Sequence, residues 1–112
     1  MISKDNAEHY VWGGDCDGWH LVKGQDLTVI HERMPPGRAE VRHHHVGARQ
    51  LFFVLSGELT MLLDGRHETL GPEQGIEIAP GQRHQAANNG ATAVEFLVIS
   101  QPTTRDDRIE RV

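Results

Sequence analysis

The sequence predicts an all-β domain of the roll or barrel type. Between residues 25 and 99 the apolar residues fall into short runs separated by turns rich in glycine and proline. The pair Asp64 and Gly65 separates two of these runs and is a strong signal for a two-residue hairpin turn. No apolar stripe with helical spacing occurs in this range. We therefore expect many short antiparallel strands with short connections.

The position of each strand follows from these runs. Residues 25–32 form the first expected strand, with Leu27, Val29 and His31 on one face. The residues that follow, Pro35 to Gly37, break this strand. Further strands are expected at residues 39–45, 50–55, 59–63, 66–70, 76–79, 84–87 and 93–99.

The length of 112 residues fits one domain with a small core. We expect this single domain to span residues 1–112, with its core at about residues 25–100. Residues 1–24 have no clear period and are expected to form an irregular arm with one or two short strands. Residues 101–112 are polar and charged, which indicates a tail or a short terminal helix.

Charge and composition argue against several classes of partner. The net charge of −5 disfavours non-specific nucleic-acid binding, which requires a basic surface. No apolar run has the length of a membrane helix, and the first residues lack the apolar segment of a signal peptide. Cys16 is the only cysteine, so an internal disulfide is impossible. We expect a cytoplasmic protein without nucleic-acid or membrane partners.

Three histidines indicate a metal site. His43 and His45 are two residues apart, so in a strand both side chains point to the same face. A third histidine, His84, follows the turn at Pro80 and Gly81. Several imidazoles that converge on one point can bind zinc, iron, nickel or copper.

These residues carry a resemblance to the cupin superfamily, whose members share two sequence motifs. In the first motif the matching residues are Gly37, His43, His45 and Gly57. Gln50 stands where the family has glutamate. In the second motif the matching residues are Gly81, His84 and Asn88, whereas Glu73 and Ala79 replace the family's glycine and proline. The motifs together cover residues 37–88, close to half of the chain.

The resemblance implies a single cupin roll, a double-stranded β-helix or jelly-roll barrel, that holds one divalent metal ion. The implied ligands are His43, His45 and His84, and the ion could be iron, manganese, nickel or zinc. The role of Gln50 has two interpretations, a weak oxygen ligand or a residue that hydrogen-bonds to the ligands. Since glutamine brings no charge, the affinity for metal should be lower than with glutamate.

The strand that follows the histidine pair is expected to line a pocket. Phe52 and Val54 share the parity of Gln50, so we expect both to face the substrate. Phe53 then faces outward and needs cover, which favours a homodimer. Trp12 and Trp19 in the arm would support such an interface. The alternative is a monomer whose arm folds over its own barrel.

Several other chemical groups have a plainer interpretation. His44 and Glu40 are expected on the face opposite to His43. Cys16 is expected to be buried and inert, because free cysteines usually are. Four charged residues are expected at the surface: Arg42, Arg49, Glu77 and Glu95. Either arginine could instead hold an anionic substrate at the pocket mouth, and either glutamate could face inward as a base.

Two functions remain open at this point. The first is a metalloenzyme that acts on a small oxygenated substrate, similar to the dioxygenases or isomerases of the cupin superfamily. The second is a non-catalytic domain that binds a small ligand or sugar, or acts as a sensor. A third possibility is a degenerate site that is kept only as part of the fold. The fold alone does not choose among them.

Overall fold

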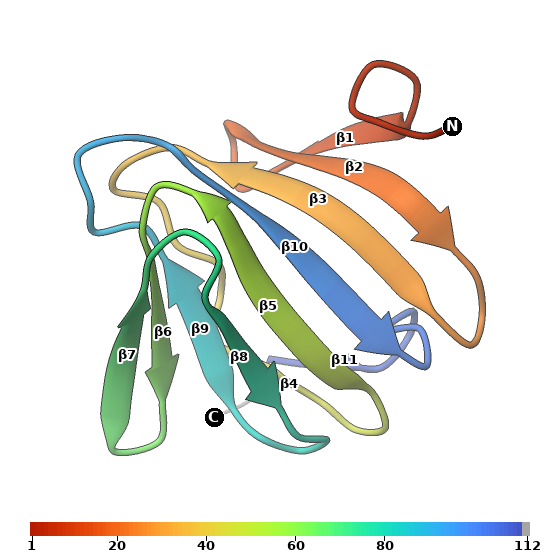
Figure 1. Cartoon of the computed structure of the whole chain (residues 1–112). Coiled ribbons are helices and arrows are strands. Elements are labelled where there is room, and N and C mark those ends of the chain that lie inside the picture. The colour runs from red at the N-terminus through yellow and green to blue at the C-terminus, as the bar shows by residue number, and fades with distance from the viewer. Residues whose placement is uncertain (111–112) are drawn as a thin grey trace.

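The structure is a computed structural model that describes residues 1–110, and these residues form eleven β-strands and no helix. The predicted all-β class is therefore confirmed. Two layers of antiparallel strands face each other and enclose the core (Figure 1). None of the described residues forms a helix that is long and apolar enough to cross a membrane.

The larger layer is a six-stranded sheet with the order β1-β2-β3-β10-β5-β8. Its strands are β1 (Glu8–Trp12), β2 (Cys16–Lys23), β3 (Thr28–Met34), β10 (Val94–Gln101), β5 (Arg49–Ser56) and β8 (Gly75–Ile78). The chain reaches β10 only after it has formed the three-stranded sheet of the other layer, and β10 lies between β3 and β5, two strands from the first half of the sequence.

The smaller layer contains a three-stranded sheet and a two-stranded sheet. The first has the order β7 (Arg66–Leu70), β6 (Leu59–Leu63) and β9 (His84–Ala87). The second pairs β4 (His44–His45) with β11 (Arg108–Ile109). Isolated bridges from Ala39 to Ala87 and from His43 to His84 attach the segment before β4 to β9. This contact joins the two small sheets into one layer (Figure 1).

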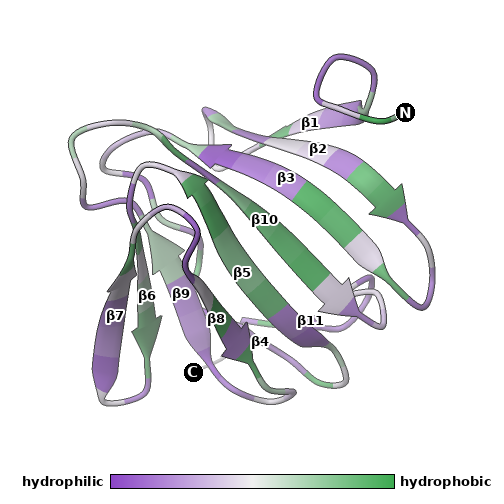
Figure 2. Ribbon diagram, viewed as in Figure 1, coloured by the Kyte–Doolittle hydropathy of each residue, from purple (hydrophilic) through white to green (hydrophobic). Residues whose placement is uncertain are grey.

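The core lies between the layers and is built by alternation along the central strands. In β5 the even-numbered Phe52 and Val54 are buried, and in β10 Phe96 and Val98 are buried. The residues between them face outward, yet many are also apolar, so β5 and β10 are hydrophobic along much of their length (Figure 2). Burial of the inner side chains is the main source of stability in a domain of this kind.

The hairpin around Asp64 and Gly65 is confirmed, since β6 and β7 pair in register on either side of that turn. Most other predicted strands also occur, with ends shifted by at most three residues. The expected strand at residues 39–45 is shorter, because only β4 is a regular strand there. In β3 the inner face is formed by the even-numbered residues from Thr28 to Met34, and not by the odd-numbered residues as predicted.

The two ends of the chain are more regular than predicted. The strands expected in the arm occur as β1 and β2, and they form a hairpin that pairs with β3 and extends the large sheet. The hairpin has no clear apolar period because Tyr10 and His20 line polar cavities, whereas Cys16 and Trp12 contact the hydrophobic core. Near the other end, β11 forms in place of a tail or helix, and residues 111–112 lie outside the described part.

Candidate metal centre

Three histidines from two segments meet at one point inside the barrel. His43 and His45 come from β4 and the residue before it, and His84 begins β9. The ring centroid of His43 lies 4.9 Å from that of His45 and 4.4 Å from that of His84. One potential ligand atom from each residue lies within 4.8 Å of the other two. All three side chains are buried.

Backbone carbonyls orient two of these rings. His43 Nδ1 lies 2.7 Å from the Val41 carbonyl oxygen, and His84 Nδ1 lies 3.0 Å from that of Gln82. Each Nδ1 donates its proton to the carbonyl, so Nε2 carries the free lone pair. His84 Nε2 is buried and has no hydrogen-bond partner among residues 1–110, and the same is true of His45 Nδ1. Such unpaired buried atoms are costly unless something binds them.

Gln50 contributes an oxygen to the same region. Its Nε2 donates a hydrogen bond to Ser100 Oγ at 3.1 Å, and its Oε1 is buried without a hydrogen-bond partner in the described part of the chain. Gln50 also lines the cavity that His43 and His45 line. Three imidazole nitrogens and one amide oxygen are a donor set that suits a divalent transition-metal ion. The residues present therefore fit the metal that the cupin motifs imply.

Burial keeps the histidines in the form that binds metal. It lowers the pKa of His43 to about 3 and that of His45 to about 4, and the nearby His84 lowers both further. Burial also lowers the pKa of His84. The rings are consequently neutral at pH 7, and an arriving cation displaces no proton from them.

A cavity of about 160 Å³ opens beside the histidines. Phe52 lines it and also packs edge-on against His84, with a centroid distance of 5.7 Å. Val54 shares the inward parity of Phe52, but it is fully buried in the core and is not among the residues that line this cavity. The remaining wall is mixed, with apolar Ile30 and Val98 beside hydroxyl, carboxyl and guanidinium groups.

Two carboxyl groups line the same cavity, from Glu32 on β3 and from Glu40. Burial raises the pKa of Glu32 to about 8, and the charge of Glu40 adds to that increase. Burial likewise raises the pKa of Glu40 to about 7, although the Ala86 backbone N–H, 3.0 Å from Oε1, opposes the change. The Arg108 guanidinium lowers both values. At neutral pH the pair can therefore hold one proton and one negative charge.

The hairpin at the start of the chain completes the wall. Tyr10 lines the cavity, and its ring lies directly over Gly18 of the neighbouring strand. A Cβ atom at Gly18 would lie only 2.2 Å from Tyr10 Cζ, so glycine is required there. Burial raises the pKa of Tyr10, with a further contribution from Glu32, and the phenol stays protonated.

The position of Glu40 corrects the expectation that it faces away from His43. Alternation from His43 does not extend back to Glu40, because residues 39–43 are held by isolated bridges and not by a regular strand. Glu32, Tyr10 and Arg108 were not predicted as site residues. A signal existed only for Glu32, as the one acid among the even-numbered residues of β3. Tyr10 and Arg108 lie in segments whose sequence shows no period.

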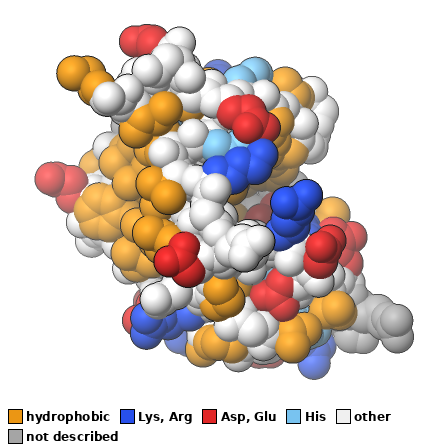
Figure 3. All heavy atoms as spheres, turned by 90° about the vertical axis from the view of Figure 1, so that its right-hand side faces the viewer, with side chains coloured by type: hydrophobic (Ala, Val, Ile, Leu, Met, Phe, Trp, Pro, Cys, Tyr) orange, Lys and Arg blue, Asp and Glu red, His pale blue; other side chains and the backbone are white. Residues whose placement is uncertain are grey.

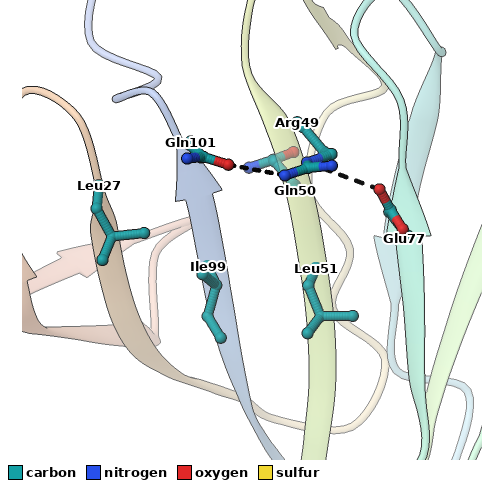
Figure 4. Close-up of a pocket in the computed structure, with 7 residues that line it drawn as sticks. All are labelled: Leu27, Arg49, Gln50, Leu51, Glu77, Ile99 and Gln101. Carbon is teal, nitrogen blue, oxygen red and sulfur yellow. Dashed lines mark hydrogen bonds and ion pairs between the residues drawn. The ribbon is translucent and has the colours of Figure 1, made fainter.

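The plainer predictions hold for the surface charges and for the cysteine. Arg42 forms an ion pair with Asp64. On the outer face of the large sheet, Arg49 Nη2 lies 2.8 Å from Gln101 Oε1, and Arg49 Nε lies 3.7 Å from Glu77 Oε2 (Figure 4). Cys16 is buried in the core, and burial raises the pKa of its thiol to about 11.

The remaining two predictions concern His44 and Glu95. His44 is half-buried and does not line the cavity. The Glu95 carboxylate accepts a hydrogen bond from Lys4 Nζ and lies 2.7 Å from His31 Nε2, away from the cavity.

Comparisons with known proteins agree with this architecture. A family model described as a cupin domain matches residues 30–100. A search of curated proteins finds no match. Among solved structures, KdgF from Halomonas sp. has a TM-score of 0.85 and 16% identity, covering 95% of this chain and 97% of its own.

Two further solved structures share the fold at similarly low sequence identity. A predicted oxalate decarboxylase from Thermotoga maritima has a TM-score of 0.83 and 18% identity, covering 92% of this chain and 99% of its own. A sugar phosphate isomerase from Silicibacter pomeroyi has a TM-score of 0.78 and 20% identity, covering 92% of this chain and 76% of its own. Identities this low show the shared fold only.

Proposed function

This chain belongs to the cupin family, and from that premise we propose that it is a metal-dependent enzyme acting on a small oxygenated molecule in the barrel cavity. One observation carries the proposal. Three buried neutral histidines and two carboxyl groups with raised pKa values line or adjoin the same cavity. Perturbed acids beside a metal-binding cluster are typical of catalytic sites.

His43, His45 and His84 would hold the ion, with Gln50 Oε1 as a further oxygen ligand. Iron, manganese, nickel and zinc are all compatible with these donors. When bound, the ion would supply Lewis-acid polarisation of a substrate oxygen or an oxygen-activating centre. Three or four protein ligands would leave coordination positions open towards the cavity.

Glu32 and Glu40 would move the protons. A general acid or base works best when its pKa lies near the working pH, and both values do so. The pair titrates as a unit, because each charge raises the cost of the other. Arg108 faces both carboxyl groups and would stabilise the singly ionised form. Ile30 and Phe52 supply apolar surface that limits the water near the reacting atoms.

The size of the cavity restricts the substrate. A volume of about 160 Å³ is smaller than the roughly 300–1,000 Å³ of pockets for drug-sized ligands. Hydroxyl, carboxyl and guanidinium groups on the wall favour a substrate that carries several oxygen atoms. Oxalate and sugar phosphates therefore belong in a first substrate panel, which the names of the similar structures also suggest.

The test measures turnover of this panel by protein loaded with each of the four metals. We expect one substrate to be consumed, and we expect Glu32→Gln and Glu40→Gln to reduce its turnover at least about a hundredfold while metal content is retained. Glu77→Gln is the matched control, because Glu77 is an exposed acid outside the cavity.

The non-catalytic alternative makes a different prediction. In that case the protein binds a small ligand with its metal in place, no substrate is consumed, and the two cavity variants change ligand affinity only. Metal-loaded protein that binds a panel member without converting it would favour this function over the enzyme.

A further inference from the structure

A second and larger cavity lies next to the metal site. It has a volume of about 480 Å³ and lies between β2, β3 and the segment after β10. Its wall includes His20, Lys23, Thr28, Ile30, Thr104 and Arg105. Ile30 and Thr104 also line the metal cavity, so the two cavities adjoin. Neither the metal ligands nor the two carboxyl groups line this second cavity.

The charge on this wall is positive, although the chain as a whole carries −5. Lys23 and Arg105 line the cavity, and none of the described residues that line it is acidic. Lys23 Nζ lies 3.1 Å from Glu8 Oε2, but both side chains are more than half exposed. Ion pairs between exposed side chains contribute little free energy. The guanidinium of Arg105 forms no ion pair with the described residues. Both cations are therefore available to a ligand.

Two polar atoms on the same wall lack a partner. Thr28 is only 6% exposed, and its Oγ1 forms no hydrogen bond with any of the described residues. His20 Nδ1 is also buried and has no hydrogen-bond partner within the part of the chain that the structure describes. Burial and the neighbouring Lys23 lower the pKa of His20, so the ring is neutral and can present an N–H at this atom. An unpaired buried hydroxyl costs stability, which a ligand oxygen would repay.

We propose that this second cavity binds the oxyanionic group of a small molecule, a carboxylate or a phosphate. Thr28 and His20 would donate hydrogen bonds, and Lys23 and Arg105 would supply the positive charge. Binding of the anion does not depend on the metal. A further step, that this anion is one end of the substrate whose other end reaches the histidines, rests on the proposed function.

Nuclear magnetic resonance of ¹⁵N-labelled protein tests the binding directly. Inorganic phosphate and acetate are titrated separately, with glycerol as the neutral control. We expect saturable shifts of the backbone amides of residues 23–28 and 103–105 with at least one anion and none with glycerol. The anion that binds more tightly identifies the preferred group. No saturable shift in these two segments with either anion would overturn the proposal.

Charge variants separate a built site from general attraction. Arg105→Gln should weaken anion binding at least about tenfold, because a charge-assisted hydrogen bond is lost. Arg66→Gln is the matched control, since Arg66 is exposed on β7 and does not line the cavity. An equal loss in both variants would show general electrostatic attraction and would contradict the site.

Thr28→Val tests the buried hydroxyl while it keeps the shape of the side chain. We expect weaker anion binding together with an equal or higher unfolding temperature, because no protein hydrogen bond is lost. A variant with unchanged anion affinity would remove Thr28 from the site. Should Thr28→Val not fold, Thr28→Ser keeps the hydroxyl and should keep the affinity.

His84→Ala separates this inference from the metal proposal. Anion binding should persist in that variant even when metal binding is lost. If substrate turnover fails in every protein while anion binding is retained, the proposed function is wrong and the anion site stands. Loss of anion binding in folded His84→Ala protein would contradict an independent site.

Discussion

His43 and His84 exchange both backbone hydrogen bonds although 40 residues separate them. The His43 N–H donates to the His84 carbonyl at 3.0 Å, and the His84 N–H donates to the His43 carbonyl at 2.9 Å. A doubly hydrogen-bonded pair fixes the two residues opposite each other and on the same face of the sheet. The rings therefore converge because of backbone register, and not because a metal draws them together.

The first prediction is that His84→Ala abolishes tight metal binding. Removal of one of three imidazoles should lower the affinity for zinc or nickel by at least about a hundredfold, since even the partners of metal ligands account for about 10–100-fold. Calorimetric titration of metal-free protein provides the measurement. His67→Ala is the control, because His67 is exposed on β7 and lies outside the cluster. Equal affinities in the two variants would contradict the metal centre.

The sequence predicted the parts of the site that depend on local spacing. His43 and His45 lie two apart, and the cupin motif placed His84 and Gln50 with them. Tyr10 reaches the cavity through the pairing of β1 with β2 and of β2 with β3, Glu32 through that of β3 with β10, and Arg108 through that of β11 with β4. Register between distant strands has no local signal, especially where the inward face is polar. That is why the acids and the arginine were missed.

The second prediction concerns Gln50→Glu, which should act in opposite directions on metal binding and on stability. A charged oxygen should increase the affinity for divalent metal at least about tenfold over the neutral amide. Without metal, the same carboxylate would be buried beside Ser100 and should lower the free energy of unfolding by on the order of 1–3 kcal/mol. Titration and denaturant unfolding of both proteins provide the data. Equal or weaker metal affinity would show that Gln50 does not contact the ion.

The third prediction is that metal binding persists well below the usual histidine range. With an unperturbed pKa near 6.5, protons would compete with metal already at pH 6. The pKa values of about 3 for His43 and about 4 for His45 move that competition to more acid solution. Metal content after equilibration at pH 5.5 should equal that at pH 7.5. Half-occupancy near pH 6.5 would contradict the lowered values.

The same shifts affect the stability of the metal-free protein in a defined direction. Between pH 6.5 and about 4, the unfolded chain binds protons that the folded rings do not. The free energy of unfolding should therefore decrease as pH falls through this window. His43→Gln should make the decrease smaller.

The fourth prediction is that Glu32→Gln stabilises the metal-free protein at alkaline pH. The folded carboxyl has a pKa of about 8, above its ordinary value of 4.5, so wild-type stability is lost as pH rises between these values. Glutamine removes that loss and should raise the free energy of unfolding by on the order of 2 kcal/mol at pH 8.5, with little change at pH 4.5. Exposed Glu77→Gln should give no such pH-dependent gain. A uniform effect across pH would contradict the raised pKa.

The outer face of the large sheet is the surface on which a homodimer would form. Leu51, Phe53 and Leu55 of β5 lie on this face beside Leu97 and Ile99 of β10. Leu51 and Ile99, with Leu27, border a shallow groove that Arg49 and Glu77 close at one end (Figure 4). Hydrophobic side chains gather along one side of the molecule (Figure 3). The arm pairs with β3 of its own chain, so it is not needed to cross to a partner.

The last prediction is that the protein forms a homodimer through this face. Apolar side chains that remain partly exposed in the monomer gain free energy when a partner buries them, and a small barrel buries only a modest part of its surface alone. Light scattering at micromolar concentration should give twice the 12.5 kDa mass of the chain.

Phe53→Asp should shift the protein to monomer, and Leu55→Asp tests the same face at a more exposed position, 40% accessible. Leu62→Asp is the control, since Leu62 has a similar exposure of 37% but lies on β6 in the other layer. A wild-type mass that stays at 12.5 kDa on concentration would refute the dimer. Dissociation by Leu62→Asp alone would place the interface on the smaller layer instead.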